Sequence, residues 1–265
     1  MPELPEVHTF QQYFNEAALN VPIKKVIVHD DKIIRNVDGP QFCKWLEGKT
    51  FTHSERRGKY LFAGLDSCQH LLLHFGMTGD LKYYQDEEDA PKHERFVIVF
   101  KDGFRLGFDC PRKFARIVTI DNLEEYIKEV NLGEDALKIS EADFLVAMGQ
   151  RKTSIKGFLL NQKLIAGVGN LYADEILYQT KIHPSSQVVA LKLKQRKMIF
   201  DSMRNILQKA VDHTAHYKEY PDDWFFQWRV EGQKAPNGKG LVSIDKIAGR
   251  TTYFFKGYQK LYTMK

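Results

Sequence analysis

The chain has 265 residues, of which 43% are hydrophobic and 28% are charged, and its formal net charge is +5. This composition excludes wholesale disorder, because enough apolar side chains are present to form cores, and the length suits two domains of ordinary size. No apolar run approaches the roughly 20 residues of a membrane-spanning helix, and the N-terminus lacks the basic and apolar regions of a signal peptide. We therefore expect a soluble protein that is not exported and has no membrane partner.

The first predicted element is a helix over residues 4–19, in which Val7, Phe10, Phe14 and Ala17 recur at helical spacing. Short β-rich runs separated by turn residues follow this helix, and they predict a sandwich or barrel. The predicted strands are residues 23–29, 59–64, 70–75, 81–84, 96–100, 104–108 and 116–120, with a helix near residues 41–46 between the first two.

After Asp121 the pattern becomes helical, and the chain closes with two strand-like runs that predict a hairpin. The predicted helices are residues 123–130, 141–148, 155–160, 171–179 and 191–211, and the last of them places Ile199, Met203, Ile206, Leu207 and Ala210 on one face; the hairpin strands are residues 240–244 and 251–255. The order predicts an α+β protein: an N-terminal β-sandwich domain with flanking helices over residues 1–125, a helical domain over 126–224, and a C-terminal β-hairpin within 225–265.

Charge and cysteine content narrow the range of partners. From Phe225 onward, eight lysines and arginines are opposed by only two acidic residues, a pattern typical of a segment that binds a polyanion, although the charge alone fits an ordinary basic surface equally well. The three cysteines, Cys43, Cys68 and Cys110, are widely separated and form no CxxC pair. Neither a disulfide framework nor a thiolate metal site is expected from them.

The sequence begins Met-Pro-Glu-Leu-Pro-Glu, and this opening has two interpretations. Prolines and carboxylates suit the first turn of a helix, which is the ordinary structural explanation. The functional interpretation requires removal of Met1, which leaves Pro2 as a secondary amine with a pKa near that of an α-amino group, ~8. Such an amine can attack a sugar C1′ and form an iminium, and the neighbouring Glu3 can transfer the protons that this chemistry needs.

Later blocks add basic and glycine-rich turns that fit contact with a polyanion. Lys59 follows Arg56-Arg57-Gly58 in a basic turn and can offer a point charge to a phosphate, while Met77 stands between glycines that allow a backbone to approach DNA closely. The glycine loop before Asn170 lacks the third glycine of a dinucleotide fingerprint and the lysine of a P-loop. It still predicts an anion site at a helix N-terminus, with Asn170 as the cap. Taken singly, each block is also compatible with ordinary loop packing.

Taken together and in this order, the blocks resemble the formamidopyrimidine-DNA glycosylase and endonuclease VIII family over almost the whole chain, from Pro2 to Gln259. The resemblance implies that Pro2 is the nucleophile and Glu3 the general acid and base, with Glu6 as a supporting carboxylate of the same motif. It also implies a helix–two-turn–helix in the helical domain. Lys59 would bind phosphate and support catalysis.

The resemblance assigns the remaining site residues to two tasks. Extrusion of a base from the duplex costs a few kcal/mol, which an apolar wedge offsets; Met77, Arg112 and Phe114 would fill the gap and face the orphaned base. The implied contacts to phosphate are Lys59, His74, Lys156, Asn170 and Arg250. Cys110 and Lys113 depart from the aspartate and arginine that are common in the family, which bears on the preference for the opposite base.

The C-terminal finger of the family usually holds zinc with four cysteines, whereas the aligned positions here are Ala235, Gly238, Phe255 and Tyr258. We therefore expect a zincless finger, a hairpin held by aromatic packing, and no cofactor. His213 and His216 are separated by helical spacing, but two imidazoles make a poor metal site, so no metal ligand is predicted.

The resemblance implies a bifunctional DNA glycosylase and AP lyase that excises oxidised bases through a Schiff base on proline and cleaves the strand by β,δ-elimination. The expected partner is double-stranded damaged DNA, bound by a monomer in the cytoplasm, at the nucleoid in a bacterium. The segment 213–223 is short, so we expect 8-oxoguanine to be handled poorly and formamidopyrimidines or oxidised pyrimidines to be preferred. Two other classes stay open: a non-catalytic protein that binds damaged DNA, and an RNA- or ribosome-binding module.

Overall fold

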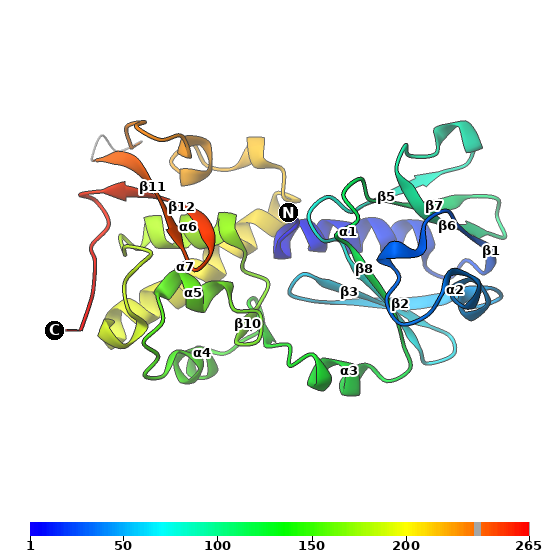
Figure 1. Ribbon diagram of the computed structural model, residues 1–265, viewed down its shortest axis with the longest axis horizontal. Coiled ribbons are helices and arrows are strands. Elements are labelled where there is room, and N and C mark those ends of the chain that lie inside the picture. Colours follow the sequence, from blue (N-terminus) through cyan, green and yellow to red (C-terminus); the bar gives the residue numbers. More distant parts are fainter. Residues whose placement is uncertain (236–239, 265) are drawn as a thin grey trace. The chain divides into compact units, whose positions relative to one another are not determined.

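The computed structural model describes residues 1–235 and 240–264 (Figure 1). The chain forms two compact units, Met1–Asn131 and Leu132–Lys265. The first contains mostly strands and the second mostly helices followed by a hairpin, which confirms the expected α+β class. The finer division of the chain at residues 125 and 224 stays a prediction.

Unit 1 begins with helix α1 (Leu4–Ala18), whose first turn contains Pro5 and Glu6. Glu3 is the N-cap residue and forms a capping box with Glu6, which satisfies backbone N–H groups that the helix itself leaves without partners. The apolar side of α1 is buried, including Val7 and Phe14, which are fully inaccessible to solvent. The start of the helix is thereby fixed both by its cap and by its packing.

Two four-stranded antiparallel sheets form the body of unit 1. In one sheet the order is β2 (Phe51–Arg57), β3 (Tyr60–Leu65), β4 (His70–His74) and β8 (Arg116–Ile120); in the other it is β1 (Ile23–Val28), β6 (Glu94–Phe100), β7 (Arg105–Asp109) and β5 (Asp80–Tyr84). Alternate residues of both sheets, such as Leu71 and Ile117 from the first and Ile98 and Phe108 from the second, enter one hydrophobic core. The expected β-sandwich is therefore confirmed.

Helices also pack on the sheets of unit 1, and several of their side chains belong to this core. Helix α2 (Gly39–Leu46) packs on β1, and α3 (Leu123–Glu129) follows β8. A second apolar cluster joins Phe62 and Leu72, which face away from the main core, to Tyr126 of α3. The two faces of the β2–β3–β4–β8 sheet thus pack against different partners.

Strand β2 is not predicted from the sequence, and Lys59, predicted within a strand, lies in a turn. Strand β2 is at the edge of its sheet and buries only Phe51 and Arg56. Its sequence therefore lacks the apolar alternation from which strands are predicted. Gly58 and Lys59 form the two-residue turn that joins β2 to β3, and Gly58 takes the positive φ of 59° that such turns favour.

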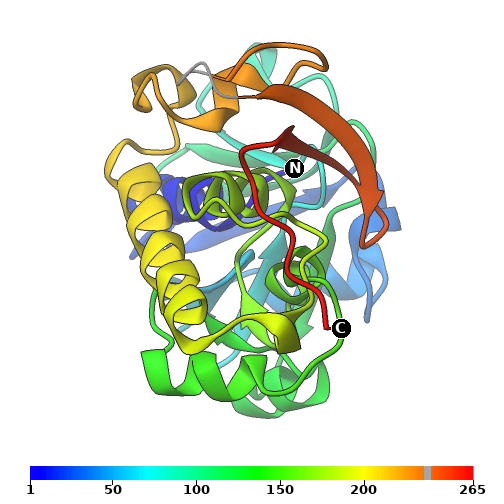
Figure 2. The same cartoon turned by 90° about the vertical axis from the view of Figure 1, so that its left-hand side faces the viewer.

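Unit 2 is built around helix α6 (Asn170–Gln179), which packs on the long helix α7 (Leu193–Asp212) and on the C-terminal hairpin (Figure 2). The five residues predicted to share one face of α7 are the ones it buries. The other elements are β9 (Glu134–Asp135) paired in parallel with β10 (Ile165–Ala166), α4 (Glu141–Met148), α5 (Ile155–Leu160) and α7 (Leu193–Asp212). Single turns of 3₁₀-helix occur in both units: η1 (Asp31–Ile33), η2 (Glu87–Asp89), η3 (Val188–Ala190), η4 (Tyr217–Glu219) and η5 (Phe225–Trp228).

The hairpin consists of β11 (Leu241–Ile247) and β12 (Arg250–Lys256), joined by the two-residue turn Ala248-Gly249. Both turn residues have positive φ, 51° and 73°, as a type I′ turn requires. The base of the hairpin packs into an aromatic cluster in which the ring of Phe255 lies 4.8 Å from Phe225 and 5.2 Å from Tyr178. Aromatic packing of the finger, which the sequence predicted, is confirmed.

The chain beyond the hairpin is tied to the helical part of unit 2 by one buried side chain. The amide of Gln259 accepts a hydrogen bond from the backbone of Phe255 at 2.8 Å and donates one to the carbonyl of Ile182 at 3.0 Å. Backbone bonds of Lys260 with Lys181 and His183 extend the connection. The C-terminal segment thus joins the base of the finger to the loop after α6.

No helix within residues 1–235 and 240–264 has the length and apolar character needed to cross a bilayer. The same residues contain no group of three histidine, cysteine or acidic side chains arranged to hold a metal ion. In particular, His213 and His216 both lie near the carboxylate of Glu219, at 3.6 and 2.9 Å, and form surface ion pairs with it when they are protonated.

Replacement of Gln259 by alanine tests how much this connection contributes. The buried N–H of Phe255 and the carbonyl of Ile182 would lose their partners, and each such loss costs about 1–3 kcal/mol. We expect Gln259→Ala to lower the free energy of unfolding in a urea titration, whereas Lys256→Ala, at an exposed position of the same hairpin, leaves it nearly unchanged. Equal stability of the two variants would contradict a structural role for Gln259.

Candidate active site

The N-terminal residues place a buried carboxyl beside Pro2. Glu3 is 3% exposed, and its backbone N–H donates to Oε2 of Glu6 at 2.8 Å. Glu6 therefore holds the backbone on which Glu3 and Pro2 are placed, which suits the supporting part expected for it. Met1 precedes them and is 51% exposed, so an aminopeptidase can reach the bond that joins it to Pro2.

Lys59 occupies the second position of the β2–β3 turn and is 8% exposed. Arg56 stabilises this turn, because its guanidinium donates to the carbonyl of Gly58 at 3.0 Å. The tight turn and the burial of the lysine stem restrict where the ammonium can lie, as a point-charge contact to phosphate requires.

His74, at the end of β4, is a neutral donor rather than a cation. Burial, together with the nearby positive charges of Arg116 and Lys59, lowers the pKa of its imidazole to about 3. Its Nδ1 accepts the backbone N–H of Gly76 at 3.3 Å, which leaves the ring proton on Nε2. His74 can therefore give an uncharged N–H to a phosphate oxygen, which refines the contact expected for it.

The three residues expected to fill the gap in the duplex come from two loops that touch through their backbones. Gly76 has a φ of 61°, and a Cβ at this position would lie 2.4 Å from the backbone of Phe114. Met77 is 40% exposed and Phe114 is 53% exposed, and the guanidinium of Arg112 lies 5.2 Å from the centre of the Phe114 ring. The structure thus brings Met77, Arg112 and Phe114 together on one side of unit 1.

Ion pairs among Asp30, Arg95 and Lys113 support the loop that carries Arg112. Asp30 pairs with Arg95 at 3.3 Å and with Lys113, and the Lys113 contact keeps the pKa of the Asp30 carboxyl below its ordinary value. Arg95 also donates to the carbonyl of Cys110 at 2.8 Å. Lys113 contacts Asp30 beneath the loop, so its departure from arginine affects the support of the loop.

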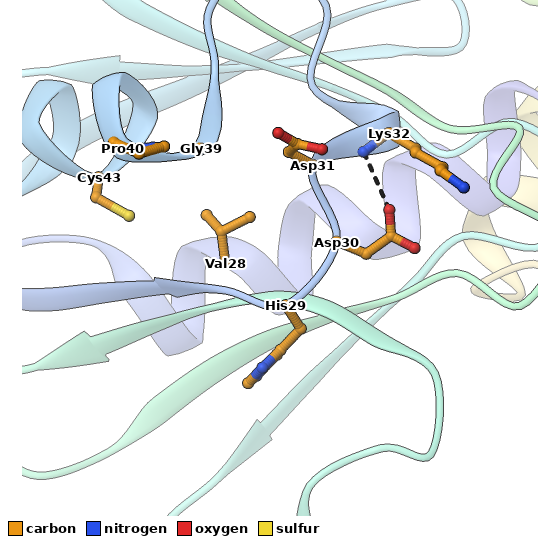
Figure 3. Close-up of a pocket in the computed structure, with 8 residues that line it drawn as sticks. All are labelled: Val28, His29, Asp30, Asp31, Lys32, Gly39, Pro40 and Cys43. Atoms are coloured by element: carbon orange, nitrogen blue, oxygen red, sulfur yellow. Dashed lines mark hydrogen bonds between the residues drawn. The ribbon is translucent and has the colours of Figure 1, made fainter.

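A surface pocket lies next to Asp30, which is one of its lining residues. Its lining residues are Val28, His29, Asp30, Asp31, Lys32, Gly39, Pro40 and Cys43 (Figure 3). Two of its polar side chains have partners: Asp30 accepts the backbone N–H of Lys32 at 3.1 Å, and His29 lies 3.0 Å from Glu94. No residue expected to take part in catalysis lines this pocket.

In unit 2, Asn170 does not cap α6, and this expectation was wrong. Gly169 is the N-cap, and Asn170 is the first residue of the helix. Its side-chain amide donates instead to the carbonyl of Thr251 on the hairpin at 3.1 Å, while its oxygen accepts no hydrogen bond from the residues that the structure describes. The contact orients Asn170 by linking the helix start to the finger.

Lys156 was expected to contact a phosphate, and the structure contradicts this. Its side chain is completely buried and its ammonium lies 2.5 Å from Oδ1 of Asp174 and 2.7 Å from Oγ1 of Thr252. The other oxygen of Asp174 accepts from Arg229 at 2.9 Å and from the backbone of Tyr253 at 3.3 Å. Lys156 therefore joins α5, α6 and the hairpin, and it presents no charge to solvent.

Arg250 is exposed at the tip of the hairpin, directly after the type I′ turn. The tip lies against α5, since a Cβ on Gly157 would be 3.4 Å from that of Ala248. Arg250 forms no ion pair with a residue that the structure describes, so its guanidinium is available to an external anion. The position suits the phosphate contact expected for it.

Three charged residues that matter to this arrangement were not selected from the sequence: Asp174, Arg229 and Arg116. Asp174 and Arg229 are far apart in the chain and only folding brings them together. The sequence offered one signal for this contact. Asp174 and Glu175 are adjacent acidic residues in a largely apolar helix, and carboxylates that become buried need charged or hydrogen-bonding partners. Arg116 gave no signal, since a single arginine at the start of a strand is common.

The buried ion pair predicts a large effect of Lys156→Met. This change leaves the Asp174 carboxylate in the interior without its ammonium partner, and loss of one member of a buried pair costs about 3–5 kcal/mol. We expect a corresponding drop in the free energy of unfolding measured with urea. Lys152→Met removes an exposed charge four residues earlier and serves as the control; an equally small effect of both changes would show that the pair contributes little.

The neutral state of His74 predicts its behaviour in ¹⁵N NMR. The ring should show the Nε2–H tautomer and no titration between pH 5 and 8, in contrast to a histidine in a short peptide. Because the folded pKa lies below the unfolded value of 6.5, the unfolded chain binds the proton first, so stability falls as the pH drops from 6.5 toward 3. Titration of the ring near pH 6.5 would refute this assignment.

Sequence comparisons cover most of the chain. Residues 1–117 match the N-terminal domain of formamidopyrimidine-DNA glycosylase, and residues 132–222 match the H2TH domain of the same enzyme. A formamidopyrimidine-DNA glycosylase of Arabidopsis thaliana is 35% identical over 99% of this chain and 72% of its own length. One from Mycoplasma mobile is 32% identical over 98% of this chain and 100% of its own.

Structural comparison agrees. A Lactococcus lactis formamidopyrimidine-DNA glycosylase, solved non-covalently bound to DNA that contains an AP site, superimposes with a TM-score of 0.86 at 28% identity and covers 96% of this chain and 97% of its own. Another complex of the Lactococcus lactis enzyme with DNA containing an abasic site gives a TM-score of 0.88 at 27% identity, over 97% of this chain and 99% of its own. With both domains matched and relatives aligned over nearly its full length, this chain belongs to the formamidopyrimidine-DNA glycosylase family.

Proposed function

We propose that this chain is a bifunctional DNA glycosylase and AP lyase that removes oxidised bases from duplex DNA. The observation that carries the proposal is the N-terminal arrangement, in which the buried carboxyl of Glu3 directly follows Pro2 and is fixed by Glu6. Membership of the family and the exposed group formed by Met77, Arg112 and Phe114 support it.

The reaction starts after removal of Met1, which frees the secondary amine of Pro2. With a pKa of about 8, a useful fraction of this amine is neutral at physiological pH. The nitrogen lone pair attacks C1′ of the damaged nucleotide and the bond between C1′ and the base breaks; the proton lost from the Pro2 nitrogen balances the proton that the departing base takes up. The C1′–O4′ bond then breaks as the nitrogen lone pair forms the C=N bond, and Glu3 supplies the proton that O4′ receives. The product is an iminium that joins Pro2 to the deoxyribose.

The iminium makes the hydrogen on C2′ acidic, because the electrons released from that carbon can move to the positive nitrogen. Loss of this proton expels the 3′ phosphate by β-elimination, and a second elimination expels the 5′ phosphate. Water then hydrolyses the iminium and returns the free amine of Pro2. No metal or other cofactor takes part in this proposed sequence.

Contacts to phosphate from Lys59, His74, Asn170 and Arg250 would hold the bent duplex. Met77, Arg112 and Phe114 would occupy the space left by the extruded nucleotide. The structural relatives include complexes with abasic-site DNA, which supports double-stranded DNA as the partner. We further propose that the chain acts as a monomer in the cytoplasm, at the nucleoid in a bacterium.

We propose formamidopyrimidines or oxidised pyrimidines as preferred substrates over 8-oxoguanine. The segment 213–223, between α7 and the finger, is short. Part of it packs against the protein, because Tyr220 is 3% exposed and its hydroxyl lies 2.8 Å from that of Tyr172. Rates on defined lesions, each opposite all four bases, test this preference. Fast excision of 8-oxoguanine would exclude it.

The mechanism predicts a covalent adduct with abasic-site DNA in the presence of borohydride, which reduces the iminium to a stable amine. Glu3→Gln should slow base release by about 10²–10⁴-fold, the usual contribution of a general acid. Glu16→Gln, at an exposed position of the same helix, is the matched control and should retain activity. The measurements are single-turnover cleavage of a lesion duplex and mass spectrometry of the trapped peptide.

Four outcomes distinguish the candidate functions. An adduct on Pro2 supports the enzyme, and retention of Met1 in an active preparation would overturn the mechanism. Tight binding of damaged DNA without any adduct or cleavage would instead indicate a non-catalytic binding protein. Preference for structured RNA over lesion DNA in a competition assay would indicate an RNA-binding module.

A further inference from the structure

Three polar side chains form a row across adjacent strands at one end of the β2–β3–β4–β8 sheet. Tyr60 begins β3, His74 ends β4 and Arg116 begins β8, and His74 and Arg116 are direct partners in the strand register. The rings of Tyr60 and His74 lie 5.0 Å apart. The guanidinium of Arg116 donates to the hydroxyl of Tyr60 at 3.3 Å and lies 6.0 Å from the centre of its ring.

Arg116 carries a charge for which unit 1 supplies no counter-ion. Its side chain is exposed, and it forms no ion pair with a residue that the structure describes. The contact with Tyr60 involves one of its five N–H donors, and the others have no partner in the described part of the chain. The Arg116 guanidinium is thus oriented by one hydrogen bond to a neutral hydroxyl, and its remaining N–H groups can bind an external anion.

The anion would meet a second donor at the same place. Arg116 is the strand partner of His74, and Lys59 directly precedes Tyr60, whose ring lies against that of His74. His74 keeps its Nε2–H while Nδ1 accepts from Gly76. A charged planar fork beside a neutral N–H donor suits the two unesterified oxygens of a phosphodiester.

We propose that Arg116 is a further DNA-binding residue of this chain, which together with His74 holds one phosphodiester of the duplex backbone. This inference rests on the proposed function, because it requires DNA as the ligand. Tyr60 positions the guanidinium and does not itself contact the DNA. Because every nucleotide carries the same phosphate, Arg116 contributes equally to damaged and undamaged duplexes and carries no sequence information.

The test is the salt dependence of binding. Each phosphate neutralised by a cation contributes about 0.9 to the slope of log Kd against log[salt] on B-DNA. Arg116→Gln should lower this slope by about 0.9, so that its disadvantage relative to the unmodified protein changes about 3.5-fold between 50 and 200 mM salt. Arg116→Lys keeps the charge and should keep the slope. Lys101→Gln, an exposed cation in the turn between β6 and β7, is the control for net charge.

Each outcome bears on the inference. An unchanged slope for Arg116→Gln, or a change matched by Lys101→Gln, would overturn it. A loss confined to lesion-bearing DNA would also contradict it, since a phosphate contact acts on both duplexes. Tyr60→Phe should retain the slope and weaken binding slightly, because only the orienting hydrogen bond is lost. Cleavage of abasic-site DNA by the unmodified protein is measured first, so failure of the proposed function is recognised separately.

Discussion

The buried ion pair between Lys156 and Asp174 is the interaction on which the second unit depends. It joins two short helices to the hairpin through Thr252 and Tyr253, and to the segment before the hairpin through Arg229, with both charges fully removed from water. A buried carboxylate is tolerated only when its oxygens are satisfied, and here each oxygen has at least one strong donor. Asn170 and Arg250, the two residues of this unit proposed to contact DNA, are both placed by the elements that the pair connects.

The hairpin also shows how a finger can be ordered by packing in place of thiolate ligands. Positions that would carry two of the cysteines are Phe255 and Tyr258, and Phe255 lies in the centre of an aromatic cluster with Tyr178 and Phe225. Gln259 then fixes the base of the hairpin to the loop after α6. The aromatic cluster and the buried amide of Gln259 distribute the stabilisation of the hairpin over several residues, whereas a metal site would supply it through its few ligands.

In the first unit, the grouping of Met77, Arg112 and Phe114 depends on the close approach of two loop backbones, at Gly76 and at Phe114. Gly76 allows the Met77 loop to touch the backbone beside Phe114, and no residue with a Cβ could take its place without moving one of the loops. The exposed side chains of Met77 and Phe114 project from the point where the two loops touch. The same sheet then carries Lys59, His74 and Arg116 in neighbouring turns and strand ends, so that donors of different charge type lie close to one another.

The sequence by itself determined the α+β class, the apolar face of α7, the aromatic finger and the family, because apolar periodicity and short ordered motifs are local properties. It misplaced what depends on contacts between distant segments. From the sequence, Lys156 was predicted to contact a phosphate, but the fold buries it against Asp174 and Thr252. Asn170 was predicted to cap a helix, but its side chain donates to the carbonyl of Thr251. Strand β2 is held by its neighbour β3 rather than by its own apolar pattern. Only the tertiary structure decides these points, because burial and pairing of a polar group depend on what the fold places beside it.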